Sequence, residues 1–224
     1  MAKVSREVTE KRPEEIMDAC VRLHETMSFR DINLKEISGE TSISRPSIYN
    51  YFQTKEEILL GVLEREYRRW DDDLRQIIRN HQEMTEDELA RALGESLEDR
   101  KLLLEIQATD LYEIEENSRQ DKLNDFKKAF LAVIDSVDGV LKKFFPRMTD
   151  EDRMNFTYEF FPFMYGIYPY AFPTEKQMKA MDSVGLKVRR TTVKELVYKC
   201  VLQLLKGAGG KELEEKKKEG KNNE

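Results

Sequence analysis

Residues with redox or metal-binding chemistry are scarce in this 224-residue chain. It has two cysteines, and because Cys20 and Cys200 lie far apart they form neither a metal-ligand spacing nor a disulfide framework. It has two histidines, and neither His24 nor His81 stands in the Glu-x-x-His spacing of a carboxylate-bridged metal site. We therefore expect two reduced thiols, no metal and no cofactor.

Long apolar runs and catalytic motifs are also absent from the sequence. No apolar stretch approaches the ~20 residues that a membrane span needs, and the first residues lack the apolar region of a signal peptide. There is no glycine-rich phosphate loop and no nucleophile elbow. We therefore expect a cytoplasmic protein without a membrane partner, and we find no catalytic residues that would support an enzyme.

Charged residues make up 37% of the chain beside 39% hydrophobic residues, a balance typical of a soluble helical protein with long solvated faces. The formal net charge is -6, so the chain has no overall basic field of the kind that attracts nucleic acids. In residues 1–60, acidic side chains slightly outnumber basic ones. A nucleic-acid site in this segment would need those carboxylates turned away and would make few phosphate contacts.

Residues 13–52 are predicted to form three helices, the last two of them short. Pro13 suits the first turn of the first helix, whose apolar residues recur at steps of three and four. Asn33 and Glu36 have the spacing of a capping box, which predicts a second helix over residues 34–40. The apolar residues of the first helix are Ile16, Ala19, Cys20, Leu23 and Met27.

The third helix is expected to present polar side chains on one face. Ser44 can cap its start and Pro46 suits its first turn, while Ile48 and Phe52 should point into the core. A helix of roughly two turns is not stable alone, so it must be packed on its neighbours. Two short helices joined by a turn in this way form a helix-turn-helix arrangement.

The polar residues of the third helix have the chemistry of base recognition. Arg45 can pair bidentately with guanine and Asn50 with adenine, and Ser47 can bond either a base edge or a phosphate. Tyr49 and Tyr51 carry hydroxyls on rigid rings that suit phosphate oxygens. The plainer interpretation also stays open, in which Arg45 is a surface cation and the tyrosines are core residues.

Lys55 lies just beyond, in the first turn of the next helix, where Thr54 and Glu57 have capping-box spacing. There its ammonium and the helix N-terminus can meet a phosphate together. The complete set of predicted DNA-binding residues is Asn33, Ser44, Arg45, Pro46, Ser47, Tyr49, Asn50, Tyr51 and Lys55.

Residues 47–58 read SIYNYFQTKEEI. This run, with the helices before it, resembles the N-terminal domain of the TetR family of bacterial transcription regulators, whose signature is xxxLYxYFxxKExL. The resemblance implies that the third helix lies in the major groove of DNA. It also implies that positions 45–47 contact bases, and that Tyr49, Tyr51 and Lys55 contact phosphates.

The resemblance is strong over about the first 65 residues and has two departures. Ser42 stands where the family commonly has a turn glycine. Ile32 and Asn33 replace a Thr-Thr pair before the second helix, although Asn33 can still cap and donate. The rest of the chain matches the family in being helical and of similar length.

Residues 55–80 are predicted to form one long helix, roughly 38 Å at ~1.5 Å per residue, that joins the first domain to the rest as a lever. Further helices are expected downstream, and residues 154–172 are apolar nearly all round. Such a helix must be buried, in the core, in a dimer face or around a ligand. Resemblance favours an effector cavity there, with Trp70, Leu74, Tyr112, Phe130, Phe160, Met164 and Tyr168 as candidate lining residues.

The expected fold is all-α, with about nine helices: a three-helix helix-turn-helix domain joined by a long helix to a larger helical domain. Residues 1–11 are expected to be a flexible arm and residues 12–56 the DNA-binding domain. Residues 57–206 are expected to form the ligand-binding and dimerisation domain, and residues 207–224 a disordered tail. Resemblance implies a homodimer that pairs through the last two long helices.

We therefore expect a ligand-responsive, dimeric DNA-binding transcriptional regulator. In this hypothesis a repressor leaves its palindromic operator when a small apolar or aromatic effector, of unknown identity, moves the long helix. The two reading helices are then no longer one DNA turn, about 34–36 Å, apart. The alternative is a helical small-molecule or partner-binding protein without specific DNA binding, which the acidic balance and Ser42 support.

Overall fold

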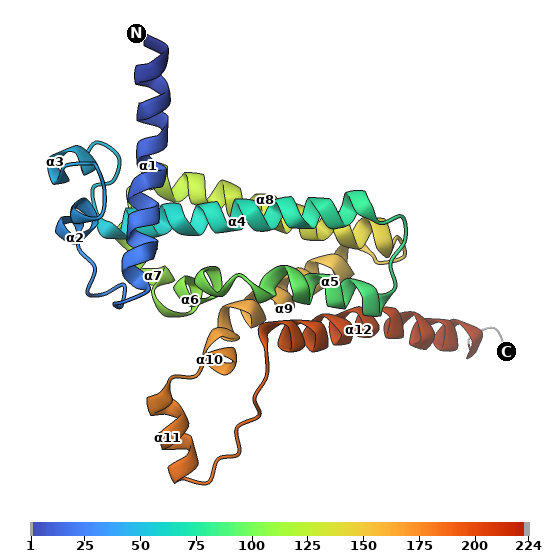
Figure 1. The fold of residues 1–224 in the computed structure, drawn as a ribbon. Coiled ribbons are helices and arrows are strands. Elements are labelled where there is room, and N and C mark those ends of the chain that lie inside the picture. The colour runs from blue at the N-terminus through green and yellow to red at the C-terminus, as the bar shows by residue number, and fades with distance from the viewer. Residues whose placement is uncertain (1, 222–224) are drawn as a thin grey trace. The chain divides into compact units, whose positions relative to one another are not determined.

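The computed structural model describes the backbone of residues 2–221 and the side-chain surroundings of residues 11–208. Regular secondary structure in this part of the chain is entirely helical, which confirms the all-α prediction (Figure 1). It comprises twelve helices, more than the nine or so expected, because short helices follow one another where longer ones were predicted. Contacts divide the chain into two compact units, Met1–Glu66 with Asp110–Ala129, and Tyr67–Thr109 with Phe130–Glu224.

The first unit contains the predicted three-helix segment and the region where α8 begins. Its helices are α1 (Ala2–His24), α2 (Leu34–Gly39), α3 (Arg45–Ile48), the start of α4 (Lys55–Asn80), α7 (Leu111–Glu116) and the start of α8 (Gln120–Phe144). Ile16, Ile37 and Ile48 are fully buried at its centre. Gly61 of α4 leaves room for the side chain of Met17 on α1, because a Cβ there would lie 2.9 Å from the Met17 sulfur.

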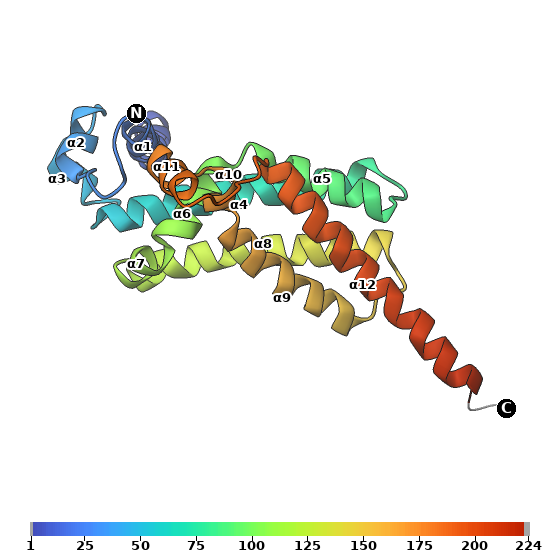
Figure 2. The same ribbon diagram turned by 90° about the horizontal axis from the view of Figure 1, so that it is seen from below.

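The second unit contains the remainder of α4 and α8 and the other helices. These are α5 (Glu86–Glu98), α6 (Lys101–Thr109), α9 (Asp150–Gly166), α10 (Tyr168–Ala171), α11 (Glu175–Ser183) and α12 (Val193–Lys221). α12 packs against α5 and α9 (Figure 2). Trp70, Tyr67 and Phe160 are the largest fully buried side chains of the second unit. The two units are defined by contacts between residues and not by function. The boundaries of the DNA-binding and ligand-binding domains expected from the sequence stay a prediction.

Helix ends follow the capping signals in most places. Asn33 with Glu36 forms a complete capping box, as predicted, and Thr85 with Glu88 forms another. Thr149 caps α9 in the same way. The prediction for Ser44 is wrong, because its side chain caps no backbone N–H and its Oγ lies 2.9 Å from Oγ of Ser47 instead.

Both ends of the chain differ from the expectation. α1 begins at Ala2, so Pro13 lies inside the helix and not in its first turn. α12 continues to Lys221, through the segment expected to be a disordered tail. Met1 and residues 222–224, which belong to the predicted arm and tail, lie outside the described residues.

α9 is less completely buried than its composition predicts. Phe156, Phe160 and Met164 are buried, whereas Tyr158 is 75% exposed and Met154 is 55% exposed. One side of the helix therefore belongs to the core and the other faces outward. None of the helices in the described range has the length and apolar character that a bilayer crossing requires.

Candidate DNA-reading surface and apolar groove

Residues 45–52, the recognition segment from here on, are held to the first unit by their apolar face. α3 itself is a single turn, and the chain then continues as turns in which the N–H groups of Tyr51 and Phe52 donate to the carbonyl of Ile48, at 2.9 and 3.0 Å. Ile48 and Phe52 are buried, as predicted. The segment therefore has no independent stability and takes its orientation from what it packs on.

The opposite face of the recognition segment carries the polar residues. Arg45, Pro46 and Asn50 are exposed, Ser47 and Tyr51 are half-buried, and Tyr49 is 45% exposed. The guanidinium of Arg45 lies 3.5 Å from the hydroxyl of Tyr49, so these two side chains lie side by side. The side chains of Arg45, Tyr49 and Asn50 are therefore accessible to solvent.

Three other predicted DNA-binding residues have structural partners. The ammonium of Lys55 donates to the carbonyls of Phe29 and Arg30, at 3.2 and 3.0 Å, and so ties α4 to the connection between α1 and α2. Oδ1 of Asn33 accepts the first N–H groups of α2. Ser44 is exposed, but its hydroxyl is hydrogen-bonded to the hydroxyl of Ser47.

The turn before α3 does not need the glycine that the family commonly has. Within the described residues no non-glycine residue has a positive φ, so Ser42 adopts an ordinary conformation. Its N–H donates to Oε1 of Glu15 at 2.7 Å. This hydrogen bond lowers the pKa of Glu15, because it stabilises the charged carboxylate.

Many carboxylates of the first unit are already engaged. Glu14 and Asp18 both pair with Arg65, at 2.8 and 2.7 Å, and Glu36 accepts the N–H of Asn33. Arg65 therefore offsets part of the acidic excess of this unit.

Arg119 is a residue of this unit that the sequence analysis did not identify. Its Nε and Nη2 donate to the two carboxylate oxygens of Glu57, at 2.7 and 3.0 Å, and its backbone N–H donates to Oε1 at 3.1 Å. The side chain of Glu57 is fully buried. Burial alone would raise the pKa of Glu57, but the bonds from Arg119 and from the N–H of Gln53 outweigh it and lower that pKa.

The residues proposed for an effector cavity are mostly core residues of the second unit. Trp70, Leu74, Phe160 and Met164 are completely buried. Trp70 lies 6.5 Å from the ring of Phe160, and its indole N–H donates to Ser96 at 3.0 Å. Trp70 and Phe160 thus belong to the aromatic centre of the second unit, and Leu74 and Met164 to its core.

The remaining three candidates lie elsewhere. Tyr112 belongs to the first unit and is 82% exposed, so it does not line an enclosed cavity. Burial and a hydrogen bond to Glu105 raise the pKa of the Tyr168 phenol. Phe130 lines an open groove between α8 and α9.

This groove has a volume of about 640 Å³ and is apolar along most of its length. Its apolar lining residues are Phe130, Ile134, Met154, Phe161, Pro162 and Tyr165. Such a volume falls within the range of small-molecule sites. The groove therefore offers apolar surface to a ligand or to another protein surface.

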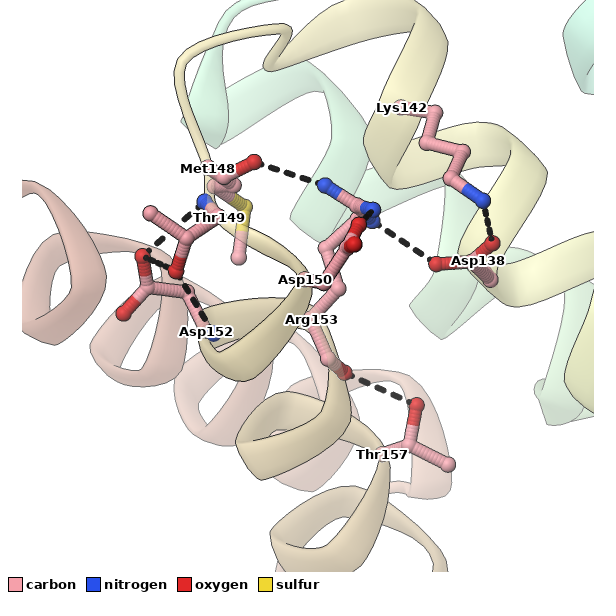
Figure 3. A network of polar contacts seen from close by, with 8 residues as sticks. All are labelled: Asp138, Lys142, Met148, Thr149, Asp150, Asp152, Arg153 and Thr157. Atoms are coloured by element: carbon pink, nitrogen blue, oxygen red, sulfur yellow. Dashed lines mark hydrogen bonds and ion pairs between the residues drawn. The ribbon is translucent and has the colours of Figure 1, made fainter.

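The charged end of the groove is an internally matched network around Arg153 (Figure 3). Arg153 donates to Asp138 at 2.8 Å, to the carbonyl of Met148 at 2.6 Å, and to Asp150. Lys142 also pairs with Asp138, at 2.6 Å. Burial would raise the pKa of Asp138, but the bonds from Lys142 and Arg153 lower it. Lys142 and Arg153 are thus paired with Asp138 and Asp150, and Asp135 also lines the groove.

Comparison with known families gives two matches that together span most of the chain. Residues 16–62 match the family described as "Bacterial regulatory proteins, tetR family". Residues 64–211 match "Tetracyclin repressor-like, C-terminal domain". No curated protein matches the chain.

Solved structures with a similar fold include three regulators of low sequence identity. The fatty acid degradation regulator FadR from Bacillus halodurans is 15% identical, with a TM-score of 0.56, over 86% of this chain and 94% of that one. FadR from Thermus thermophilus, a TetR-family transcriptional repressor in complex with lauroyl-CoA, is 20% identical, with a TM-score of 0.55, over 88% and 94%. A TetR-family transcriptional regulator from Mesorhizobium loti is 17% identical, with a TM-score of 0.56, over 88% and 96%. At these identities the likeness shows the fold alone.

Proposed function

Because this chain belongs to the TetR family of bacterial regulators, we propose that it is a repressor that binds a palindromic operator as a homodimer and leaves it when an apolar effector binds. The observation that carries this proposal is the recognition segment. Its apolar residues anchor it, and its polar residues face outward. Operator DNA lies in the cytoplasm, so the proposed function implies a cytoplasmic location and no catalytic role.

We assign base recognition to Arg45, Ser47 and Asn50. Arg45 and Asn50 are exposed, and their guanidinium and amide groups suit guanine and adenine in the major groove. Tyr49 and Tyr51 are assigned to phosphates on either side. A single recognition segment makes few contacts, which is why a dimer that reads two half-sites is required.

We assign Lys55 two roles, one within the protein and one in DNA binding. Its ammonium fixes the connection between α1 and α2. Its place in the first turn of α4 also puts a positive charge at a helix N-terminus, where a phosphate is favoured. Substitution of Lys55 would therefore disturb the fold of the unit as well as DNA binding, and it is a poor test of DNA contact.

The effector is proposed to act by a population shift. A ligand that binds better to one arrangement of the second unit favours that arrangement. α4 and α8 each continue from the first unit into the second, so a change in these helices can reach the recognition segment through the chain itself. Because the Thermus relative was solved with lauroyl-CoA, the first effector class to test is a long-chain acyl-CoA, which joins an apolar acyl chain to a charged CoA group.

The test is a mobility-shift titration of the full chain on the DNA upstream of its own gene, at low salt. We expect a discrete complex that Arg45→Ala and Asn50→Ala each weaken and that lauroyl-CoA dissociates. Lys128→Met, which removes one charge from an exposed pair with Asp125 on α8, is the matched control. Failure of the unmodified protein to bind, or full binding by both recognition-segment variants, would refute the proposed function.

A further inference from the structure

The turn between the recognition segment and α4 is held by a segment from much later in the chain. Four successive residues, 51–54, are all tied to it. Nη2 of Arg119 donates to the carbonyl of Tyr51 at 3.4 Å, and the hydroxyl of Thr54 donates to the carbonyl of Asn117 at 3.1 Å. All of these residues belong to the first unit.

The two residues between them are held as well. The ammonium of Lys122 lies 5.4 Å from the centre of the Phe52 ring, a cation–π distance. The N–H of Gln53 donates to Oε2 of Glu57 at 2.7 Å, and Glu57 in turn is bound by Arg119. Tyr51, Phe52 and Thr54 therefore contact residues 117–122 directly, and Gln53 is linked to them through Glu57.

Arg119 is the centre of these contacts because one guanidinium serves two partners. Its fork binds both oxygens of the buried Glu57 carboxylate and also reaches the backbone of Tyr51. Bidentate charge-assisted bonds of this kind are strong and directional. A lysine ammonium lacks the planar fork and would not hold the carboxylate and the carbonyl together.

We propose that Arg119 and Glu57 are positioning residues for DNA recognition. The pair fixes the carboxyl end of the recognition segment, and so the direction in which Tyr49, Asn50 and Tyr51 project, without itself contacting DNA. This inference rests on the proposed function. It adds that the orientation of the reading surface depends on Arg119, which directly precedes α8 and lies outside the helix-turn-helix sequence.

The test compares Arg119→Met and Arg119→Lys with the control Lys128→Met in the full-length protein. The dissociation constant is measured by fluorescence anisotropy on the DNA fragment that the unmodified protein binds. The active fraction comes from a separate stoichiometric titration, and circular dichroism sets a temperature at which each variant is folded. If Arg119 were needed only for folding, its substitution would lower the active fraction and leave the dissociation constant of the active protein unchanged.

We expect Arg119→Met to raise the dissociation constant at least tenfold and Arg119→Lys several-fold, with less than a twofold change for Lys128→Met. The slope of affinity against salt concentration should stay the same, because no phosphate contact is lost. Affinity within twofold of the control would overturn the inference. A slope reduced by about one would also overturn it, since Arg119 would then contact a phosphate itself.

Removal of Arg119 leaves a buried carboxylate unpaired, so Arg119→Met could fail to fold. Glu57→Gln then provides the second variant, because glutamine keeps the shape of the Glu57 side chain and removes its negative charge. Hydrogen exchange at the amides of Phe52 and Gln53 should be faster in Glu57→Gln and Arg119→Lys, while amides of α5 are unchanged. Unchanged exchange at these two amides would refute the positioning role, whereas failure of the unmodified protein to bind DNA would refute the proposed function instead.

Discussion

Gly94 should be the least replaceable of the described helical glycines, because α5 and α12 meet there. A Cβ built on Gly94 would lie 2.8 Å from the carbonyl oxygen of Lys194 and 3.4 Å from its Cα. Real side chains do not approach a backbone so closely, and neither atom is the end of a flexible side chain. Gly94→Ala would therefore force the backbones of the two helices apart.

The expected net effect of Gly94→Ala follows from two opposing terms. Alanine favours a helix over glycine by about 1 kcal/mol. Overpacking of this kind costs about 1–3 kcal/mol, and contact with backbone places this site at the upper end. We expect the second unit to lose about 1–2 kcal/mol of stability, measured by urea denaturation.

Gly207→Ala is the matched control, because Gly207 lies inside α12 with no atom within 4 Å of a Cβ there. It should gain up to about 1 kcal/mol. If Gly94→Ala were as stable as the unmodified protein, the close approach of α5 and α12 would be wrong.

Three further predictions concern the recognition segment, the buried ion pair and the effector. Ile48→Ala should cost about 2–5 kcal/mol in the first unit, because Ile48 is completely buried, and it should abolish operator binding while the second unit still unfolds at its usual denaturant concentration. The folded pKa of Glu57 is lowered, so its ion pair should stabilise the protein above the unfolded value of about 4.3 and cease to do so as pH falls through the folded value. The stability difference between the unmodified protein and Glu57→Gln should therefore shrink between about pH 5 and pH 3. Lauroyl-CoA should raise the melting temperature of the second unit, by mass action on the folded state.

Each of these three predictions has a result that would count against it. Ile48→Ala with normal operator affinity would show that the segment is not held by its apolar face. A constant difference between pH 5 and pH 3 would mean that Glu57 is not ionised through its pair with Arg119. A melting temperature unaffected by lauroyl-CoA, beside a shift with a compound that has an apolar chain and no CoA group, would count against an acyl-CoA effector.

Features that depend on neighbouring residues could be predicted from the sequence. The helix over 55–80 has the predicted bounds, because its apolar stripe is unbroken and no proline interrupts it. The capping box of Asn33 and Glu36 forms as expected, since both residues lie within one turn. Ile48 and Phe52 are core residues because helical spacing places them on one face.

Features that depend on distant residues could not be predicted. Arg119 lies 62 positions from Glu57, and no periodicity or motif connects them. The partners of the Lys55 ammonium are backbone carbonyls, which have no sequence signature. Residue type alone groups Tyr112 with the aromatic candidates, yet Tyr112 is exposed, because residue type does not determine which face of a short helix points inward.

The most direct test of the account is a footprint of the full-length protein on the DNA upstream of its own gene. If two copies present their recognition segments to one side of a duplex, two protected half-sites should appear about 10–10.5 base pairs apart, or a multiple of that spacing. The Arg45→Ala, Asn50→Ala double variant should lose both. A single protected site, or protection that the double variant retains, would contradict the claim that this segment reads DNA.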